Sequence, residues 1–129
     1  MEDMSLDEMS FKIRGMLFKI QNELGTKFQE KHYLKALCAL LDQENFKYNT
    51  EVPFSINYCG TKLGDFRADI VIENQILLEL KTTDYITKDH FKQTIRYVEA
   101  LNLPLAYIIN FRIRPLQIKR LFNSSALTN

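Results

Sequence analysis

The sequence predicts an α/β protein in which helices pack against a mixed sheet, and two observations support this prediction. Three segments place apolar residues at helical spacing, and four shorter segments alternate or run continuously apolar, as strands do. Their order is helix, helix, three strands, helix and strand. With 129 residues and 46% hydrophobic content, the chain is expected to fold as a single domain over residues 1–129, with flexible ends at 1–4 and 123–129.

The charge balance and the cysteines narrow the class of protein. There are 17 basic and 16 acidic residues, so a nucleic-acid partner has to meet a local patch rather than an overall charge. No apolar run approaches the roughly 18 residues of a membrane span, which excludes a membrane partner. Two cysteines, Cys38 and Cys59, without a His/Cys cluster indicate a reducing compartment and no structural zinc. We therefore expect a cytoplasmic protein.

Two helices are predicted first. Ser5 and Glu8 have capping-box spacing at the start of the first helix, and Gly25 stands where a C-terminal cap belongs. The second helix is expected over 28–41. Its buried stripe consists of Tyr33, Leu34, Leu37, Leu40 and Leu41.

Glu30 falls within that apolar stripe, and two interpretations are open. A carboxylate on a core-facing stripe is costly unless it has a partner. Near the start of the helix, Glu30 can favour the helix dipole and reach water. Alternatively, it points toward the carboxylate pair described below and joins a metal site.

Three antiparallel strands are expected to form a meander. The first covers 51–59, where Pro53 indicates an edge position, and a turn at Gly60–Thr61 leads toward the second. The second and third strands are 66–72 and 76–81. A later apolar run, 105–111, is typical of a strand buried on both faces, and 116–122 fits either a strand or a helix.

The register of the second and third strands brings two carboxylates together. Alternation puts Phe66, Ala68, Ile70 and Ile72 on one face of the second strand, with Arg67, Asp69 and Val71 on the other. Burying both apolar faces on one side requires an odd loop, which 73–75 supplies. This register places Asp69 beside Glu79 and Arg67 across from Lys81.

Paired carboxylates on a sheet repel, and that repulsion is informative. Like charges directly opposite destabilise a sheet, and neighbouring carboxylates resist double ionisation. Mg²⁺ prefers hard oxygen ligands and would relieve the repulsion, while Lys81 would stabilise negative charge on a phosphate or help position the attacking water. The plainer interpretation is a solvated sheet face on which Asp69 pairs with Arg67 or Lys81.

A third helix is predicted over 88–101, with Thr87 as its N-cap. We expect Gln93 and Tyr97 to share a face one turn apart. The inward line is expected to be Phe91, Ile95, Val98 and Asn102, widened by Leu101.

A basic row also follows that helix. Lys88, Lys92 and Arg96 recur at every fourth residue. Such a row is usually a solvated face, but beside a metal-binding carboxylate cluster it becomes a track for phosphates.

These residues together resemble a known superfamily. An Asp on one strand, Glu-x-Lys on the next, Glu30 on a preceding helix and Gln93-x-x-x-Tyr97 on a following one are similar to the PD-(D/E)XK nucleases. More narrowly, the chain resembles the bacterial GxxExxY proteins. The segments that carry the likeness are Leu24-Gly25, Glu30 with Tyr33, Phe66 to Asp69, Leu78 to Lys81, His90 with Gln93 and Tyr97, and Ile109 to Phe111.

Two positions depart from the family pattern. Lys27 stands where the naming glycine of the GxxExxY proteins belongs, which affects the turn before the helix more than the chemistry. Ala68 rather than proline precedes Asp69, as is common in the superfamily.

The resemblance implies a restriction-endonuclease-like α-β-β-β-α-β core with an extra N-terminal helix, and Mg²⁺-dependent phosphodiester hydrolysis in which Mn²⁺ substitutes. Asp69, Glu79 and Glu30 would hold the metal, Glu30 directly or through water, and Lys81 would assist the water and the transition state. Gln93 and Tyr97 would orient the site and the nucleic-acid strand.

The expected partner is nucleic acid, with DNA favoured over RNA. The alternative is a non-catalytic module that keeps the fold and binds nucleic acid or protein. A homodimer, or an accessory subunit that needs a protein partner, is a further expectation.

Overall fold

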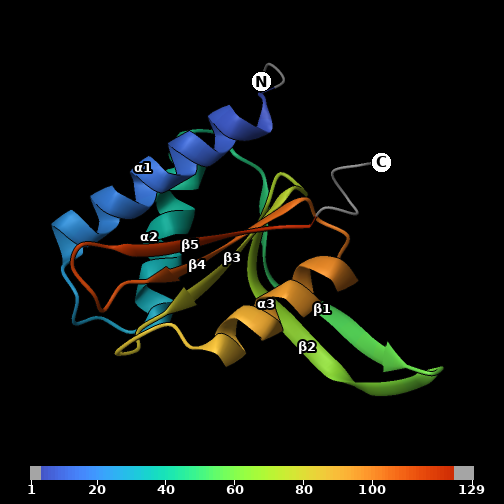
Figure 1. Ribbon diagram of the computed structural model, residues 1–129. Helices are drawn as coiled ribbons and strands as arrows, with labels where there is room; N and C mark the ends of the chain where they lie inside the picture. The colour runs from blue at the N-terminus through green and yellow to red at the C-terminus, as the bar shows by residue number, and fades with distance from the viewer. Residues whose placement is uncertain (1–3, 124–129) are drawn as a thin grey trace.

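The computed structural model describes residues 4–123 and contains a five-stranded mixed sheet with helices on both faces (Figure 1). The strand order is β1-β2-β3-β4-β5, in which β3 and β4 are parallel and the other neighbours antiparallel. The expected α/β class and the restriction-endonuclease-like core are confirmed. The elements in chain order are α1 (Leu6–Leu24), α2 (Glu30–Gln43), β1 (Tyr48–Tyr58), β2 (Thr61–Ile72), β3 (Ile76–Lys81), α3 (Lys88–Ala100), β4 (Leu105–Asn110) and β5 (Gln117–Phe122).

The helix caps explain where α1 and α2 begin and end. The Ser5 side chain accepts a hydrogen bond from the Glu8 N–H at 3.1 Å, and Gly25 ends α1 with a φ of 81°. Helix α2 begins at Glu30, two residues later than expected. There His32 Nδ1 accepts a hydrogen bond from the Gln29 N–H at 3.1 Å. Glutamine and histidine are not typical capping residues, so this cap was not predicted.

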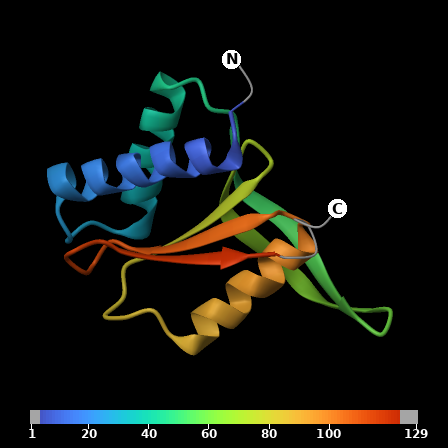
Figure 2. The ribbon, with the colours of Figure 1, turned by 45° about the horizontal axis from the view of Figure 1, so that its top comes forward.

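The sheet separates two cores (Figure 2). Helices α1 and α2 cover one face and bury the side chains of Ile70, Ile72 and Leu78 there. Helix α3 covers the other face and packs on Val71 and Leu77. Each fully buried side chain of this size contributes about 1.5–3 kcal/mol, so both faces of the sheet stabilise the fold.

The expected alternation along β2 is wrong at one point. Ala68 belongs to the core under α3, whereas Ile70 belongs to the core under α1 and α2. The β1–β2 ladder passes from the pair Thr50–Ile70 to the pair Val52–Ala68, and Glu51 between them has a φ of 49°. The hairpin therefore turns at Glu51 and Asp69, and its outer half extends away from the body of the sheet (Figures 1 and 2).

Helix α3 faces the sheet with a different line from the one expected. Thr87 caps it as predicted, but Ile95 is 41% exposed and Asn102 is exposed, so neither is an inward residue. Its buried residues are Thr94, Tyr97 and Val98. The Tyr97 ring is drawn inward because it packs against the Phe54 ring of β1, 4.6 Å away between centroids.

The remaining expectations concern the C-terminal strands and the two ends. Strand β4 is buried throughout, as predicted, and the segment left open between strand and helix forms β5. Met4 packs against the core, and Asn123 is buried, donating through its backbone N–H to the Pro104 carbonyl at 3.0 Å. The other residues expected to be flexible, 1–3 and 124–129, lie outside the described residues. Within residues 4–123 no helix is long and apolar enough to cross a membrane.

Candidate active site

Asp69 and Glu79 lie together where β2 separates from β3. Glu79 Oε1 accepts a hydrogen bond from the Asp69 N–H at 3.1 Å, and Asp69 Oδ2 accepts one from the Leu80 N–H at 2.8 Å. The two carboxyl groups also lie within hydrogen-bonding reach of each other. Each carboxylate is thus fixed by the main chain of the other strand.

The register behind this arrangement is the one expected from the sequence. Residues 73–75 form a three-residue turn, and Ile70, Val71 and Ile72 pair with Leu78, Leu77 and Ile76. The same register continued by one pair sets Asp69 against Glu79. The main-chain ladder ends there, because the Asp69 and Leu80 N–H groups donate to carboxylate oxygens instead of to main-chain carbonyls.

The expectation that Arg67 lies across the sheet from Lys81 is wrong. Arg67 lies beyond the point of separation, pairs with Pro53 of β1 and is 70% exposed. Its nearest anion is Glu51, at 3.8 Å between Nη1 and Oε2. Because the hairpin bends away at Asp69, Arg67 contributes nothing to neutralising the carboxylate pair.

Burial makes the carboxylate pair difficult to ionise. Glu79 is only 5% exposed, and burial, followed by the negative charge of Asp69, raises the pKa of Glu79 to about 8. Burial also raises the pKa of Asp69, although the Leu80 N–H and the Lys81 charge oppose the rise. A bound cation, or a proton shared between the two carboxyl groups, would therefore stabilise the pair.

Lys81 and Glu30 complete the charged cluster. The Lys81 ammonium lies close enough to lower the pKa of Asp69, Glu79 and Glu30. Glu30 is the first residue of α2 and is largely exposed, yet partial burial and then the charge of Asp69 raise its pKa. Glu30 therefore reaches water and also lies close enough to Asp69 for the two charges to interact, whereas its place in a metal site stays a prediction.

Helix α3 brings Gln93 and Tyr97 to the same region. Tyr97 is 6% exposed, and its side chain bonds to that of Gln93. Burial, then the charges of Glu79 and Asp69, raises the pKa of Tyr97. The phenol therefore lies next to the carboxylate pair.

The basic row on α3 is exposed and partly lines a pocket beside the site. Lys88, Lys92 and Arg96 are all exposed. The pocket has a volume of about 280 Å³ and is lined by Ile56, Phe66, Asp89, Lys92, Gln93, Arg96 and Tyr97. Four of the five expected substrate-binding residues border it, and the fifth, Lys88, is the first residue of the same helix.

One supporting residue, Asn110, lies in a segment that carries the family resemblance, but no role was predicted for it. Asn110 is fully buried at the end of β4, where its Oδ1 accepts from the Thr83 N–H at 3.2 Å and its Nδ2 donates to the Thr83 carbonyl at 2.8 Å. The Phe111 N–H also donates to the Lys81 carbonyl at 3.0 Å. These bonds fasten the main chain at Lys81 and at Thr83, two residues later. The sequence signal for this supporting role is an asparagine within an otherwise apolar strand.

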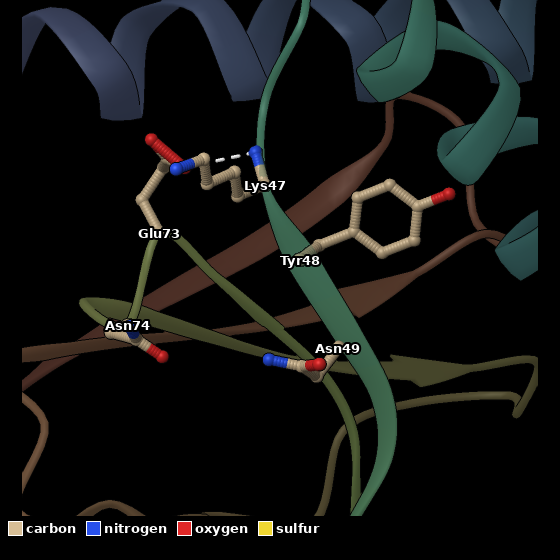
Figure 3. A pocket seen from close by; sticks show the side chains of 5 residues that line it. All are labelled: Lys47, Tyr48, Asn49, Glu73 and Asn74. Carbon is tan, nitrogen blue, oxygen red and sulfur yellow. Dashed lines mark hydrogen bonds between the residues drawn. The ribbon is translucent and has the colours of Figure 1, made fainter.

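A second pocket, of about 380 Å³, lies at the other end of β3 (Figure 3). It is lined by Lys47, Tyr48, Asn49, Glu73 and Asn74, and Glu73 Oε2 accepts a hydrogen bond from the Lys47 N–H at 2.9 Å. Strand β3 separates this pocket from Glu79 and Lys81, so it plays no part in the candidate site.

The residue types at the site suit a divalent cation, but their side chains do not form a complete set of metal ligands. Within residues 4–123 no group of three or more His, Cys, Asp and Glu side chains is arranged to hold a metal ion. Asp69 and Glu79 nonetheless offer buried oxygen donors whose ionisation a cation would favour. Oxygen donors of this kind are the preferred ligands of Mg²⁺.

Paired carboxylates beside a lysine on this fold are typical of nucleases. Comparison with known proteins identifies the family of the chain. The chain belongs to the PD-(D/E)XK nuclease superfamily, whose family model matches residues 7–121. No curated protein sequence matches the chain.

A solved structure shares the fold. The protein in "Crystal structure of SSO0001" superposes with a TM-score of 0.52 and 19% sequence identity, over 93% of this chain and 65% of that chain. This chain therefore spans about two thirds of that protein's length, and at this identity the likeness concerns the fold alone.

Proposed function

We propose that the protein is a Mg²⁺-dependent nuclease that hydrolyses phosphodiester bonds of nucleic acid, with DNA favoured and Mn²⁺ able to substitute. The observation that carries this proposal is the pair of buried Glu79 and half-buried Asp69 beside the Lys81 ammonium. A merely structural sheet position has no physical reason to keep two partly or fully buried carboxylates whose pKa values are both raised.

Each residue has a proposed role. Asp69 and Glu79 would hold the metal ion, and Glu30 would join them directly or through water. When bound, the ion acts as a Lewis acid and lowers the pKa of water. Lys81 stabilises the negative charge that develops on the phosphate and helps to hold the attacking water.

Helix α3 supplies the substrate contacts. Gln93 and Tyr97 orient the strand and the carboxylate pair, because their linked side chains lie next to that pair. Lys88, Lys92 and Arg96 are exposed on the same helix and would contact phosphates.

A nuclease assay with a matched control tests this function. The wild type is incubated with Mg²⁺ and a mixture of DNA and RNA substrates, beside Asp69→Asn and Asp65→Asn. Asp65 lies on the same strand but is exposed and paired with Lys62 at 2.9 Å. We expect Asp69→Asn to lose on the order of 100-fold or more in rate and Asp65→Asn to stay near wild type. No cleavage by the wild type would favour the non-catalytic binding module, and equal cleavage by all three proteins would remove Asp69 from the mechanism.

Several narrower features belong to the same proposal. The likeness to the bacterial GxxExxY proteins, a cytoplasmic location, and assembly as a homodimer or with an accessory protein are expected on the grounds given by the sequence. Size-exclusion chromatography with light scattering tests the assembly.

A further inference from the structure

Two adjacent pockets lie between α3 and the β1–β2 hairpin. One is the 280 Å³ pocket bordered by Tyr97, and the other has a volume of about 470 Å³. The second pocket is lined by Ser55, Ile56, Asn57, Arg96, Glu99 and Ala100. Ile56 and Arg96 line both pockets, so the two lie side by side, and we call them together the hairpin groove.

The hairpin groove leads away from the carboxylate pair. One end is bordered by Tyr97 and by Phe66, which lies three residues before Asp69 on β2. The other end is bordered by Asn57, one residue before Tyr58 near the tip of the hairpin. Tyr58 lines neither pocket, lies just beyond Asn57 and is 69% exposed. An elongated ligand in the groove would therefore run from the hairpin tip to the site.

The walls combine apolar surface with cations. Ile56, Phe66 and Tyr97 supply the apolar part. Lys92 and Arg96 supply exposed positive charge along α3, but Asp89 and Glu99 also border the groove and balance it. Because the net charge of the lining is zero, attraction to phosphates alone does not explain the groove, and the apolar surface needs a partner.

Unpaired nucleic acid matches this combination better than a duplex does. A duplex presents its phosphates outward and keeps its base faces stacked inside, so the apolar wall and Tyr58 would stay unused. A single strand presents phosphates and free base faces, and stacking of a base on an aromatic side chain contributes about 1–3 kcal/mol. Pockets of a few hundred Å³ also have the size of sites for small ligands, hence for one or two nucleotides each.

We infer that the hairpin groove binds an unpaired strand of nucleic acid, with a base stacked on Tyr58, and delivers it to Asp69 and Glu79. Delivery for cleavage rests on the proposed function, whereas binding in the groove does not. An unpaired end, flap or single-stranded substrate is the class this geometry selects.

Fluorescence anisotropy tests the binding without cleavage. A labelled single-stranded DNA oligonucleotide is titrated with protein in EDTA, and unlabelled RNA of the same sequence and the matching DNA duplex serve as competitors. Tyr58→Ala and Lys92→Ala are compared with Phe122→Ala and Lys119→Ala, which truncate exposed residues of β5 outside the groove. Because Tyr58 is 69% exposed, its truncation removes little buried surface, and a thermal melt verifies folding.

We expect Tyr58→Ala to raise Kd about tenfold, Lys92→Ala to raise Kd and flatten its salt dependence, and both β5 variants to bind as the wild type does. The RNA competitor tells whether the sugar matters. A duplex that competes as well as the single strand, or groove variants that bind like the controls, would overturn the inference.

A parallel cleavage assay separates this inference from the proposed function. Cleavage of single-stranded DNA that the groove variants leave unchanged would keep the nuclease and refute delivery through the groove. Groove-dependent binding of the single strand without any cleavage in Mg²⁺ would keep the groove and refute the nuclease.

Discussion

Glu79 and Asp69 each hold the main chain of the opposite strand: Glu79 Oε1 accepts from the Asp69 N–H at 3.1 Å, and Asp69 Oδ2 from the Leu80 N–H at 2.8 Å. The carboxylates therefore replace the ladder bonds at the point where β2 leaves β3. Their positions are fixed before any ligand arrives, which limits the reorganisation that metal or substrate binding requires.

Removing the Glu79 charge should stabilise the metal-free protein, and more strongly at high pH. The pKa of Glu79 in the folded protein, about 8, lies above its ordinary value of 4.5. The folded protein therefore holds the proton more tightly, and this contribution to stability is complete below the unfolded pKa and is lost as pH rises through the folded one. We expect Glu79→Gln to raise the free energy of unfolding by about 1–3 kcal/mol at pH 9 and by little at pH 5.

Urea denaturation in EDTA at the two pH values measures this difference. Titrating groups away from the site cancel between wild type and variant, whereas Asp69 and Tyr97 interact with Glu79 and belong to the measured difference. The exposed Glu44→Gln serves as a control. An equal effect of Glu79→Gln at both pH values would show that Glu79 ionises normally in the folded protein.

Lys81→Met should separate cleavage from metal binding. The methionine keeps the apolar stem and removes the charge that lies close to Asp69 and Glu79. We expect the cleavage rate to fall about 100-fold or more while metal binding persists. Lys12→Met, at an exposed position of α1, controls for loss of a positive charge. Unimpaired cleavage by Lys81→Met would remove Lys81 from the mechanism.

Tyr97→Phe should lower activity with little loss of stability. The ring would keep its contact with Phe54, whereas the hydroxyl and its bond to Gln93 would be lost. We expect the rate to fall about tenfold and the free energy of unfolding to change by about 1 kcal/mol or less. Gln93→Ala should have a similar effect, and the double variant should be no worse than either single one, because one linked pair is removed. Fully additive losses would mean that the two residues act separately.

Asn110→Ala should loosen the chain around Lys81. Three hydrogen bonds end on this buried amide, from the Thr83 and Arg112 N–H groups and to the Thr83 carbonyl. We expect a loss of about 1–3 kcal/mol in the free energy of unfolding, because buried main-chain groups are left unpaired. In the cleavage assay kcat should fall more than KM changes. Exposed Asn22→Ala is the control, and a variant as stable and active as that control would deny Asn110 this positioning role.

The pairing of Asp69 with Glu79 was predictable because it depends only on local rules. Strand alternation and the parity of the 73–75 turn fix the register, and the turn has the expected length. The boundaries of α1 followed in the same way from its capping residues, Ser5 and Gly25.

The separation of the strands beyond Asp69 was not predictable, because alternation carries no information about where a hairpin bends. The expectation for Arg67 failed for that reason. The inward face of α3 also escaped prediction, since hydropathy ranks Ile95 above Tyr97. The choice depends on the Phe54 ring of β1, a contact between residues far apart in the sequence. The hairpin groove depends on the same bend.

Calorimetric titration of the metal-free protein with Mn²⁺ tests the central claim most directly. The wild type should bind the ion with release of protons at pH 7, because binding ionises a carboxyl whose pKa is raised. Glu79→Gln and Asp69→Asn should lose that binding, while Asp65→Asn should keep it. Two results would contradict a metal site at Asp69 and Glu79: no binding of Mn²⁺ by the wild type, or equal binding of Mn²⁺ by all four proteins.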